Sequence, residues 1–359
     1  MKKATIDDVA ALAGVSIKTV SRVINKEPNV RDSTIQRVQK AVHKLNYRPN
    51  LSARSLAGKR SYLIGLLYDD PSLYDNPSSN YIVNVQQGAL RVCKSENHDL
   101  VIHPCDYKGK NLNNEIRSLI SQSRVDGLIL TPPLSDKKSL IAAIRKTGTP
   151  VVRIAPGDNT ESHSSVYTND REICATMTEH LASLGHTRIA FITGNPDHKA
   201  LANRYLGYQD GLKNCGLKFL KGLVREGDNS FGSGEECARK LLQMKNPPTA
   251  IFSCNDDMAT GVLRAAYQLR IRVPDQLSVA GFDDIPLAQQ IYPALTTIRQ
   301  PVRSMAESAV EILMDEIRSK PAPEKTLMID AELRIRESTG PAPSESRSKR
   351  KTARSAAAA

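Results

Sequence analysis

The sequence predicts an α-helical head followed by an α/β body of two lobes, and three observations predict this fold. Residues 5–25 contain two short amphipathic stretches separated by Gly14, which is typical of a helix-turn-helix. From residue 62 onward, apolar runs alternate with amphipathic stretches, which indicates parallel strands covered by helices on both faces. Residues 61–340 are too many for one open sheet, so we expect two Rossmann-like lobes.

The head is expected to contain three helices. Thr5 can cap the first helix, with Asp8 three residues further on as its partner in a capping box. Ser16 can cap a second helix that extends to Asn25. A third helix is expected to begin near Asp32, because apolar residues recur at helical spacing from there.

The body is expected to contain seven strands and eight helices. The strands begin at Tyr62, Leu100, Val125, Pro150, Arg188, Thr249 and Ser278. The helices span residues 81–96, 112–123, 138–147, 171–184, 200–215, 233–244, 257–270 and 301–319. In such sheets a ligand binds beyond the carboxyl ends of the strands, so the two lobes should face each other there.

The charge of the chain is concentrated at its two ends. The 359 residues include 50 Lys and Arg against 38 Asp and Glu, a net charge of +12. Residues 1–60 have a net charge of +9, residues 61–340 of −1 and residues 341–359 of +4. A basic head of this size favours a polyanionic partner, most often nucleic acid. A solvated basic surface is the alternative that charge alone leaves open.

Several classes of protein are not expected. No run of about 18 apolar residues predicts a membrane helix, and MKKATIDD lacks an apolar signal segment, so we expect a cytoplasmic protein without a membrane partner. The six cysteines form no CxxC pair and are expected to be reduced. The sequence contains no GxSxG, HExxH or phosphate loop. We therefore expect no enzyme, no catalytic residue, no metal site and no cofactor.

The motifs in order resemble one family along most of the chain. The head ATIDDVAALAGVSIKTVSRVIN and the segment YRPNLSARSLAGKRS closely resemble the LacI/GalR family of bacterial transcription repressors. The body blocks HLASLGHTRIAFITG, NRYLGYQDGL, PTAIFSCNDDMATGVLRAA and PDQLSVAGFDD continue the resemblance, which covers residues 4–338. It implies a DNA-binding head and a periplasmic-binding-protein-like body that binds a small effector, most often a sugar.

This resemblance implies a division into five segments. They are a helix-turn-helix domain (1–49), a hinge helix and linker (50–60), an N-terminal lobe (61–168 with 299–325), a C-terminal lobe (169–298 with 326–340) and a basic tail (341–359). The tail has low complexity and no periodic apolar face, so we expect it to be disordered.

The expected DNA contacts lie in the head and the hinge. A recognition helix meets base edges with its N-terminal residues, and the resemblance assigns base reading to Ile17, Lys18 and Arg22. Short polar residues suited to phosphate contacts are Thr5, Ser16, Thr19, Ser21 and Asn25, with a helix cap or a solvated face as their alternative role. In the hinge, the resemblance makes Leu56 the wedge in the minor groove, with Asn50, Ala53, Arg54 and Ala57 beside it.

The expected effector contacts lie in the cleft between the lobes. The resemblance assigns this role to Arg204, Asn255 and Asp283. An Arg–Asp pair suits a polyol because it offers both donors and acceptors, whereas Asp256 is expected to cap a helix. Asp69 is placed at the mouth of the cleft, and Tyr81, Tyr167 and Phe231 are expected to form apolar walls.

The expected function is sugar-responsive repression by a homodimer. One small head gives little specificity, so two heads should read the half-sites of a palindromic double-stranded operator. A second possibility is a co-repressed regulator that binds DNA more tightly with a purine or a phosphocarrier protein. A third, a sugar-binding transport protein, is disfavoured by the basic head and the missing signal segment.

Overall fold

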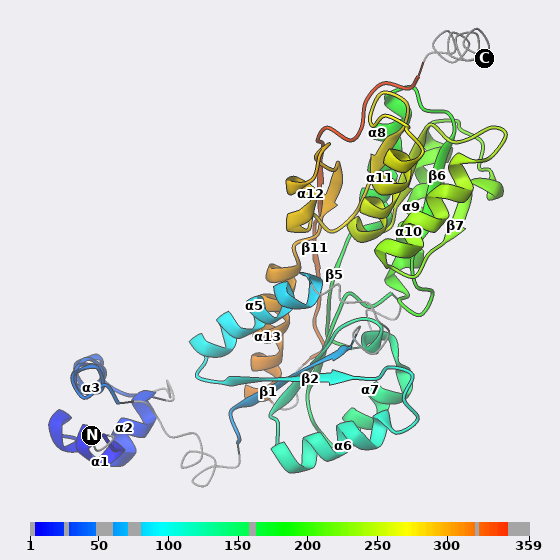
Figure 1. Cartoon of the computed structure of the whole chain (residues 1–359). Helices are drawn as coiled ribbons and strands as arrows, with labels where there is room; N and C mark the ends of the chain where they lie inside the picture. The colour runs from blue at the N-terminus through cyan, green and yellow to red at the C-terminus, as the bar shows by residue number, and fades with distance from the viewer. Residues whose placement is uncertain are drawn as a thin grey trace, which may run out of the picture.

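The computed structural model describes residues 4–24, 29–47, 60–70, 80–157, 163–319 and 323–343. A head of three helices precedes a body of two α/β lobes (Figure 1). The predicted fold class is therefore observed. The expected hinge residues, Asn25 and most of the basic tail lie outside the described residues.

The head has its own small apolar core. Its helices are α1 (Ile6–Ala13), α2 (Ile17–Ile24) and α3 (Asp32–Lys44). The fully or nearly fully buried side chains are Val9, Ala10, Ala13, Val20, Val38 and Ala41. The predicted capping box is present, because Thr5 accepts from the backbone of Asp8 while Asp8 accepts from the backbone of Thr5. Gly14 ends α1 at a φ of 62°, a left-handed conformation that suits glycine.

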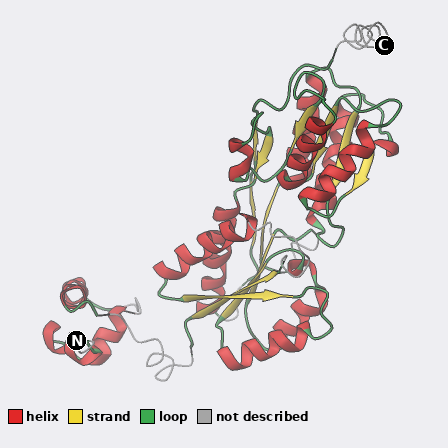
Figure 2. Cartoon of the chain, viewed as in Figure 1, coloured by secondary structure: helices red, strands yellow, loops and turns green. Residues whose placement is uncertain are grey.

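The N-terminal lobe is a six-stranded parallel sheet in the order β11-β5-β4-β3-β1-β2. Its strands are β1 (Leu63–Asp69), β2 (Asp99–Cys105), β3 (Gly127–Leu130), β4 (Val151–Ile154), β5 (Ser165–Thr168) and β11 (Thr326–Ile329). Helices α5 (Asn80–Ser95) and α13 (Val302–Arg318) cover one face, and α6 (Leu112–Ser123) and α7 (Lys138–Arg145) cover the other. Figure 2 shows the strands between these helices. A short 3₁₀ turn spans Leu134–Asp136.

The C-terminal lobe is a four-stranded parallel sheet in the order β7-β6-β8-β9. Its strands are β6 (Ile189–Thr193), β7 (Val224–Glu226), β8 (Ala250–Ser253) and β9 (Ser278–Ala280). The helices that pair beside it are α8 (Asp170–Ser183) with α9 (Ala200–Asn214) and α10 (Phe231–Leu242) with α11 (Asp256–Gln268). A 3₁₀ turn (Lys221–Leu223), the short α12 (Pro286–Gln290) and an antiparallel pair, β10 (Thr297–Arg299) with β12 (Glu332–Arg334), complete the described part of the lobe.

The chain crosses between the lobes three times, and hydrogen bonds tie the crossings together. Ala331 donates its backbone N–H to Asn169 Oδ1 at 2.9 Å, and Gln300 Nε2 donates to Thr168 Oγ1 at 3.4 Å. One expected boundary needs correction: residues 326–329 were assigned to the C-terminal lobe, but they form β11 in the N-terminal sheet. Strand β11 pairs in parallel with β5. The third crossing between the lobes therefore comes after β11, at residues 330–331.

The C-terminal segment is anchored at the end of the C-terminal lobe that lies away from the N-terminal lobe (Figure 1). The buried His186 ring lies 2.8 Å from Ser278 Oγ and 3.1 Å from the carbonyl of Gly340. Ala342 donates its backbone N–H to Leu184 at 2.8 Å. These contacts hold residues 340–342 against the C-terminal lobe.

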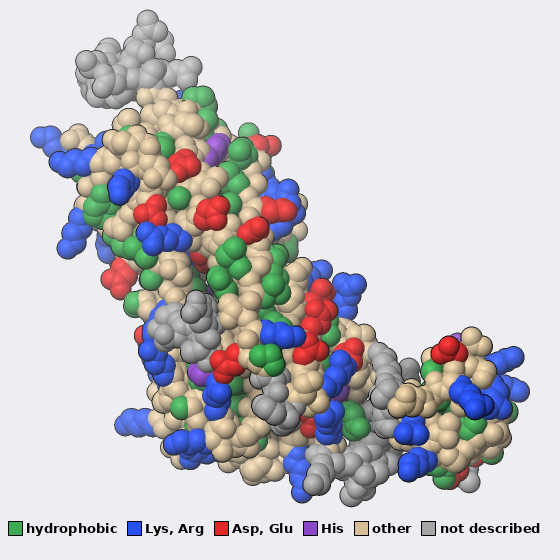
Figure 3. Space-filling model, turned by 180° about the vertical axis from the view of Figure 1, so that it is seen from behind, with side chains coloured by type: hydrophobic (Ala, Val, Ile, Leu, Met, Phe, Trp, Pro, Cys, Tyr) green, Lys and Arg blue, Asp and Glu red, His purple; other side chains and the backbone are tan. Residues whose placement is uncertain are grey.

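The charge distribution on the body and the state of the cysteines agree with what the composition predicts. On the face seen in Figure 3, Lys and Arg side chains of the body are interspersed with Asp and Glu. All six cysteines are free thiols, and five of them are buried. None of the described helices is long and apolar enough to span a membrane.

Candidate functional site

A cavity of about 470 Å³ lies between the two lobes, at the carboxyl ends of the strands. Residues of both lobes line it, and Gln300 joins them from a crossing segment. Five of the seven expected effector residues are among the lining residues: Asp69, Tyr81, Arg204, Asn255 and Asp283. The position predicted from parallel-sheet topology is therefore where the cavity lies.

Arg204 of α9 is the buried cation of the cavity. Its Nε donates to Asp170 Oδ2 at 2.9 Å, and its Nη1 donates to the carbonyl of Cys254 at 2.6 Å. Its guanidinium lies 3.5 Å from the centroid of the Phe282 ring. Burial acts to lower the pKa of Arg204, but the carboxylates of Asp170 and Asp283 outweigh this and raise it, so the side chain stays charged. Arg204 is thus held rigidly with its charge compensated.

Asp283 supplies the facing carboxylate. Its Oδ1 lies 3.7 Å from Arg204 Nη1, and 19% of the side chain is exposed. Its backbone has a φ of 113°, a strained conformation of the kind that is kept where a side chain must be aimed. Burial raises the pKa of Asp283 to about 7, although Arg204 opposes the shift. The group can therefore accept or donate hydrogen bonds near neutral pH.

Asn255 lines the cavity but already uses its side chain within the protein. Its Oδ1 accepts from Met258 N at 3.0 Å, which caps α11, and its Nδ2 donates to the carbonyl of Asn229 at 2.9 Å. The expectation that Asp256 is the cap is wrong. Asp256 is buried and accepts instead from Ile285 N and Thr297 Oγ1. Asn255 therefore acts mainly by holding Asn229, which also lines the cavity.

Several polar lining residues are not among the predicted ones. Asp69 and Tyr81 were predicted from the sequence, whereas His198 and Gln300 were not. His198 follows β6, and a search of the loops after the predicted strands would have included it, whereas Gln300 follows β10, a strand that was not predicted. Burial lowers the pKa of His198 to about 3, with Arg204 adding to the shift, so its ring is neutral.

Three buried polar atoms of the lining have no hydrogen-bond partner among the described residues. They are Tyr81 Oη, His198 Nε2 and Gln300 Oε1. A buried polar group without a partner costs about 1–3 kcal/mol, so such groups are rare unless a ligand or water completes them. The three atoms come from the N-terminal lobe, the C-terminal lobe and a crossing segment, so one ligand could contact all three parts.

Contacts between the lobes bring the walls of the cavity together. Lys108 Nζ of the N-terminal lobe lies 3.5 Å from Asp197 Oδ2 of the C-terminal lobe. A Cβ added to Gly157 would lie 2.3 Å from the carbonyl carbon of Lys199, so only glycine permits this approach. Asp69 is held inside the wall, because its carboxylate accepts from Tyr107 N at 2.9 Å.

Two expected wall residues lie elsewhere. Tyr167 is half-buried in β5 and Phe231 begins α10, and neither is among the residues that line the cavity. The Phe231 ring lies instead 5.8 Å from the guanidinium of Arg264.

The head presents a helix face suited to DNA. Ile17, Lys18 and Arg22 are exposed on α2, and Ile17 is 47% exposed although it is apolar. Ser16 Oγ accepts from Thr19 N at 3.2 Å and so caps α2, while Val20 on the opposite side is fully buried. Thr5 Oγ1 bonds to Asp8, so its hydroxyl is used in the capping box. Ser21 is half-buried.

Comparisons with known proteins agree with this architecture. Residues 5–50 match the family model of bacterial regulatory proteins of the lacI family, and residues 178–339 match the periplasmic binding protein-like domain. The repressor PurR of Photobacterium profundum is 33% identical over 93% of this chain and 98% of its own. The ribose operon repressor of Escherichia coli is 36% identical over 88% and 93%. A structure of the lac repressor dimer bound to operator and an anti-inducer has a TM-score of 0.72 and 30% identity, covering 94% of this chain and all of that one.

A helix-turn-helix head joined to a two-lobe body with a polar cavity defines a DNA-binding regulator that responds to a small molecule. The similarity to repressors extends over nearly the whole chain, from the head to the end of the C-terminal lobe. The chain belongs to the LacI family of bacterial transcriptional regulators.

Proposed function

We propose that the protein represses genes of carbohydrate use and that a small uncharged sugar in the cavity releases it from its operator. The observation that carries this proposal is the set of unpartnered atoms on Tyr81, His198 and Gln300. Together with the Asp283 carboxylate they offer donors and acceptors at several places around one cavity. A compact polyol presents hydroxyl groups in several directions, each able to donate and accept.

The charge of the cavity favours an uncharged ligand. Four carboxyl groups line it, on Asp69, Asp228, Asp257 and Asp283, against the two cations Lys108 and Arg204. Both cations are already paired, with Asp197 and Asp170. An anionic effector such as a hexuronate or a sugar phosphate would therefore meet excess negative charge.

A purine co-repressor is the second candidate. A purine stacks on aromatic faces, and the aromatic lining residues of the described chain are Tyr81, Tyr107 and His198. Asn229 occupies a lining position with a small polar amide. The chain's similarity to a ribose operon repressor makes D-ribose the first sugar to test.

The release mechanism rests on two positions of the lobes. A sugar that contacts Tyr81, His198 and Gln300 together binds best when the two lobes are closed. The Lys108–Asp197 contact holds the lobes in this closed position. The sugar can shift the repressor only by its difference in affinity between the two states. Because Gln300 is bonded to Thr168 in another crossing, the ligand acts directly on the hinge between the lobes.

We further propose a cytoplasmic homodimer that reads a palindromic operator. Ile17, Lys18 and Arg22 would contact base edges, while Ser16 and Thr19 would approach phosphates. Two heads are needed because one recognition helix reads only a few base pairs. The proposal assigns no catalytic step to the chain, since its relatives are regulators.

A ligand screen followed by an operator titration tests the proposal. The full chain is heated with D-ribose, other uncharged sugars, a hexuronate and purine bases, and the midpoint of unfolding is measured. We expect an uncharged sugar to raise the midpoint and to weaken operator binding in a gel-shift assay. A purine that alone stabilises the protein and tightens DNA binding would establish co-repression instead. Absence of any DNA binding at low salt would point to a transport protein.

A further inference from the structure

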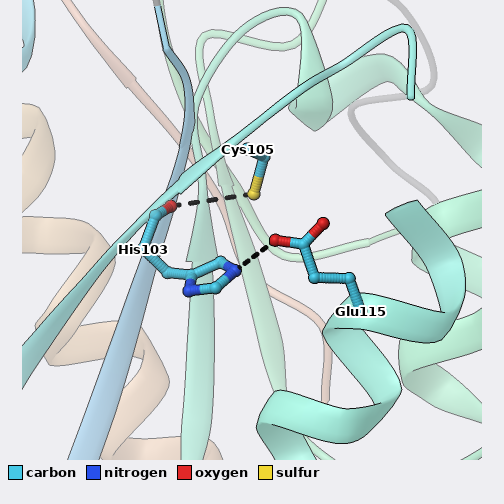
Figure 4. Close-up of side chains that lie close together, drawn as sticks. All are labelled: His103, Cys105 and Glu115. Carbon is cyan, nitrogen blue, oxygen red and sulfur yellow. Dashed lines mark hydrogen bonds and ion pairs between the residues drawn. The ribbon is translucent and has the colours of Figure 1, made fainter. Parts of the chain in front are cut away.

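A second cluster of polar and thiol side chains lies outside the cavity, between β2 and α6. His103 and Cys105 project from the same face of β2, the edge strand of the N-terminal sheet, because residues two apart share a face. Glu115 of α6 meets them from the helix that covers this face (Figure 4). His103 Nε2 lies 2.7 Å from Glu115 Oε1, and one nitrogen, one sulfur and one oxygen lie within 4.8 Å of one another.

We propose that His103, Cys105 and Glu115 form a binding site for a zinc-type divalent cation. A nitrogen, a sulfur and a carboxylate oxygen are the donor set that zinc accepts, and three protein ligands with one water complete its tetrahedral shell. Magnesium and calcium are excluded as preferred ions, because they require several oxygen ligands and the site offers one carboxylate.

The surroundings of the three residues suit a metal site that solvent can reach. Cys105 is 1% exposed and is packed in the apolar core beneath α6, so its sulfur is held in place. His103 and Glu115 are 26% and 44% exposed, which leaves a path for the ion. Metal binding would form a bond between the metal and the Cys105 sulfur and release the thiol proton to solvent.

The alternative is a surface ion pair between His103 and Glu115 with no metal role. It explains the 2.7 Å contact and leaves Cys105 as a buried apolar thiol, whose weak hydrogen bond goes to the His103 carbonyl of its own strand at 3.7 Å. The alternative predicts that replacing Cys105 leaves the binding of metals unchanged. The metal site predicts that Cys105 supplies a spectroscopically visible ligand.

Cobalt binding separates the two possibilities. The full chain with Cys215→Ser, which removes its one exposed thiol, is reduced, freed of metal and titrated with Co²⁺. We expect about one cobalt per chain, visible bands of four-coordinate cobalt and a thiolate-to-cobalt charge-transfer band in the near ultraviolet. Zinc should displace the cobalt and abolish these bands.

Matched variants keep the test decisive. Cys105→Ser should abolish the charge-transfer band, whereas Cys93→Ser, a buried cysteine of α5 in the same lobe, should preserve it. Glu115→Gln lies on an exposed helix surface and should weaken cobalt binding by about tenfold or more, even if Cys105→Ser fails to fold. Absence of the band at millimolar cobalt, or unchanged binding in Glu115→Gln, would overturn the proposal and indicate an adventitious ion only. None of these measurements depends on operator or effector.

Discussion

The Asp126 carboxylate accepts a hydrogen bond from the backbone nitrogen of Tyr62 at 2.8 Å. It also accepts from Ser61 N at 3.0 Å and from Ser61 Oγ at 3.3 Å. Asp126 immediately precedes β3, and β3 leads at its other end to Pro132 and Pro133 in the cavity wall. One strand therefore connects the effector cavity with the point at which the linker from the head enters the body.

Loss of this carboxylate should loosen the entry of the linker. We expect Asp126→Ala to lower the free energy of unfolding by on the order of 1 kcal/mol, because it leaves two part-buried backbone N–H groups without this partner. Operator affinity should fall while sugar affinity is preserved. Urea unfolding and gel-shift titration measure these effects, with Asp99→Ala at the exposed start of β2 as the control. Equal operator affinity of Asp126→Ala and Asp99→Ala would contradict a role of Asp126 in positioning the linker from the head.

Asp283 should give the protein a distinctive pH dependence. Its pKa is raised to about 7 in the folded protein, so the folded state holds the proton more tightly than the unfolded state. The stability contributed by protonated Asp283 is present at acidic pH and is lost as the pH rises from about 4 to about 7. Asp283→Asn should flatten this part of the profile of unfolding free energy against pH.

The same substitution should weaken effector binding. A hydrogen bond to a charged group contributes about 1.5–3 kcal/mol, which corresponds to about a tenfold to hundredfold loss of sugar affinity. Isothermal titration of the sugar identified in the screen measures this loss. Asp210→Asn, on the exposed side of α9 in the same lobe, is the matched control and should bind normally. Normal sugar binding by Asp283→Asn would show that Asp283 does not contribute to the affinity for the sugar.

Arg204 should matter for stability as well as for binding. Arg204→Met leaves Asp170 buried without its ion-pair partner, and breaking such a pair costs about 3–5 kcal/mol. A double variant that adds Asp170→Asn should recover part of the loss, since the uncompensated charge is removed. Urea unfolding of the single and double variants gives the coupling, and the surface variant Arg171→Met should hardly change stability. Strictly additive losses would show that the pair is not coupled.

The exposed face of α2 should determine operator choice. Ile17→Ala and Lys18→Ala should each cost about 1–3 kcal/mol on the specific operator and much less on random DNA. The measurement is the ratio of each variant's affinity for the operator to its affinity for random DNA at a fixed salt concentration. Lys94→Ala on the body has the same change in charge and should leave the ratio unchanged. An equal loss on both DNAs for Lys18→Ala would indicate a phosphate contact.

The long helices and the main strands could be predicted from the sequence because their apolar periodicity is strong. The helix expected over residues 112–123 has those bounds, and the one expected over 171–184 is α8 at 170–183. The strands β5, β7, β10, β11 and β12 were not predicted. The equally short β3, β4, β8 and β9 are buried throughout and were predicted, whereas β7, β11 and β12 are partly exposed. Their pairing depends on neighbouring strands and not on local pattern.

The candidate site was predictable in part for similar reasons. Arg204 and Asp283 stand in recognisable sequence blocks, and both line the cavity. Gln300 and His198 are defined by burial that arises only when the lobes meet, so no local signal distinguishes them. Tyr167 and Phe231 were expected to line the cavity but do not, since Tyr167 is half-buried in β5 and the Phe231 ring lies beside Arg264.

The basic tail should contribute little to DNA binding. Deleting residues 344–359 should leave the slope of log affinity against log salt unchanged, whereas each lost phosphate contact would reduce it by about 0.9. Operator titrations at several salt concentrations make this comparison, and Lys18→Ala serves as a head variant for reference. A shallower slope after deletion would place the tail on the DNA.

The anchoring of Gly340 beside His186 also makes the two ends of the body suitable for different attachments. The body begins near β1 in the N-terminal lobe, whereas the described C-terminal segment lies at the far end of the C-terminal lobe (Figure 1). A fluorophore, an affinity handle or a surface tether placed after Pro343 would therefore stand away from the recognition helices. An immobilised repressor oriented in this way would report changes in operator binding directly, as a biosensor for its small-molecule effector.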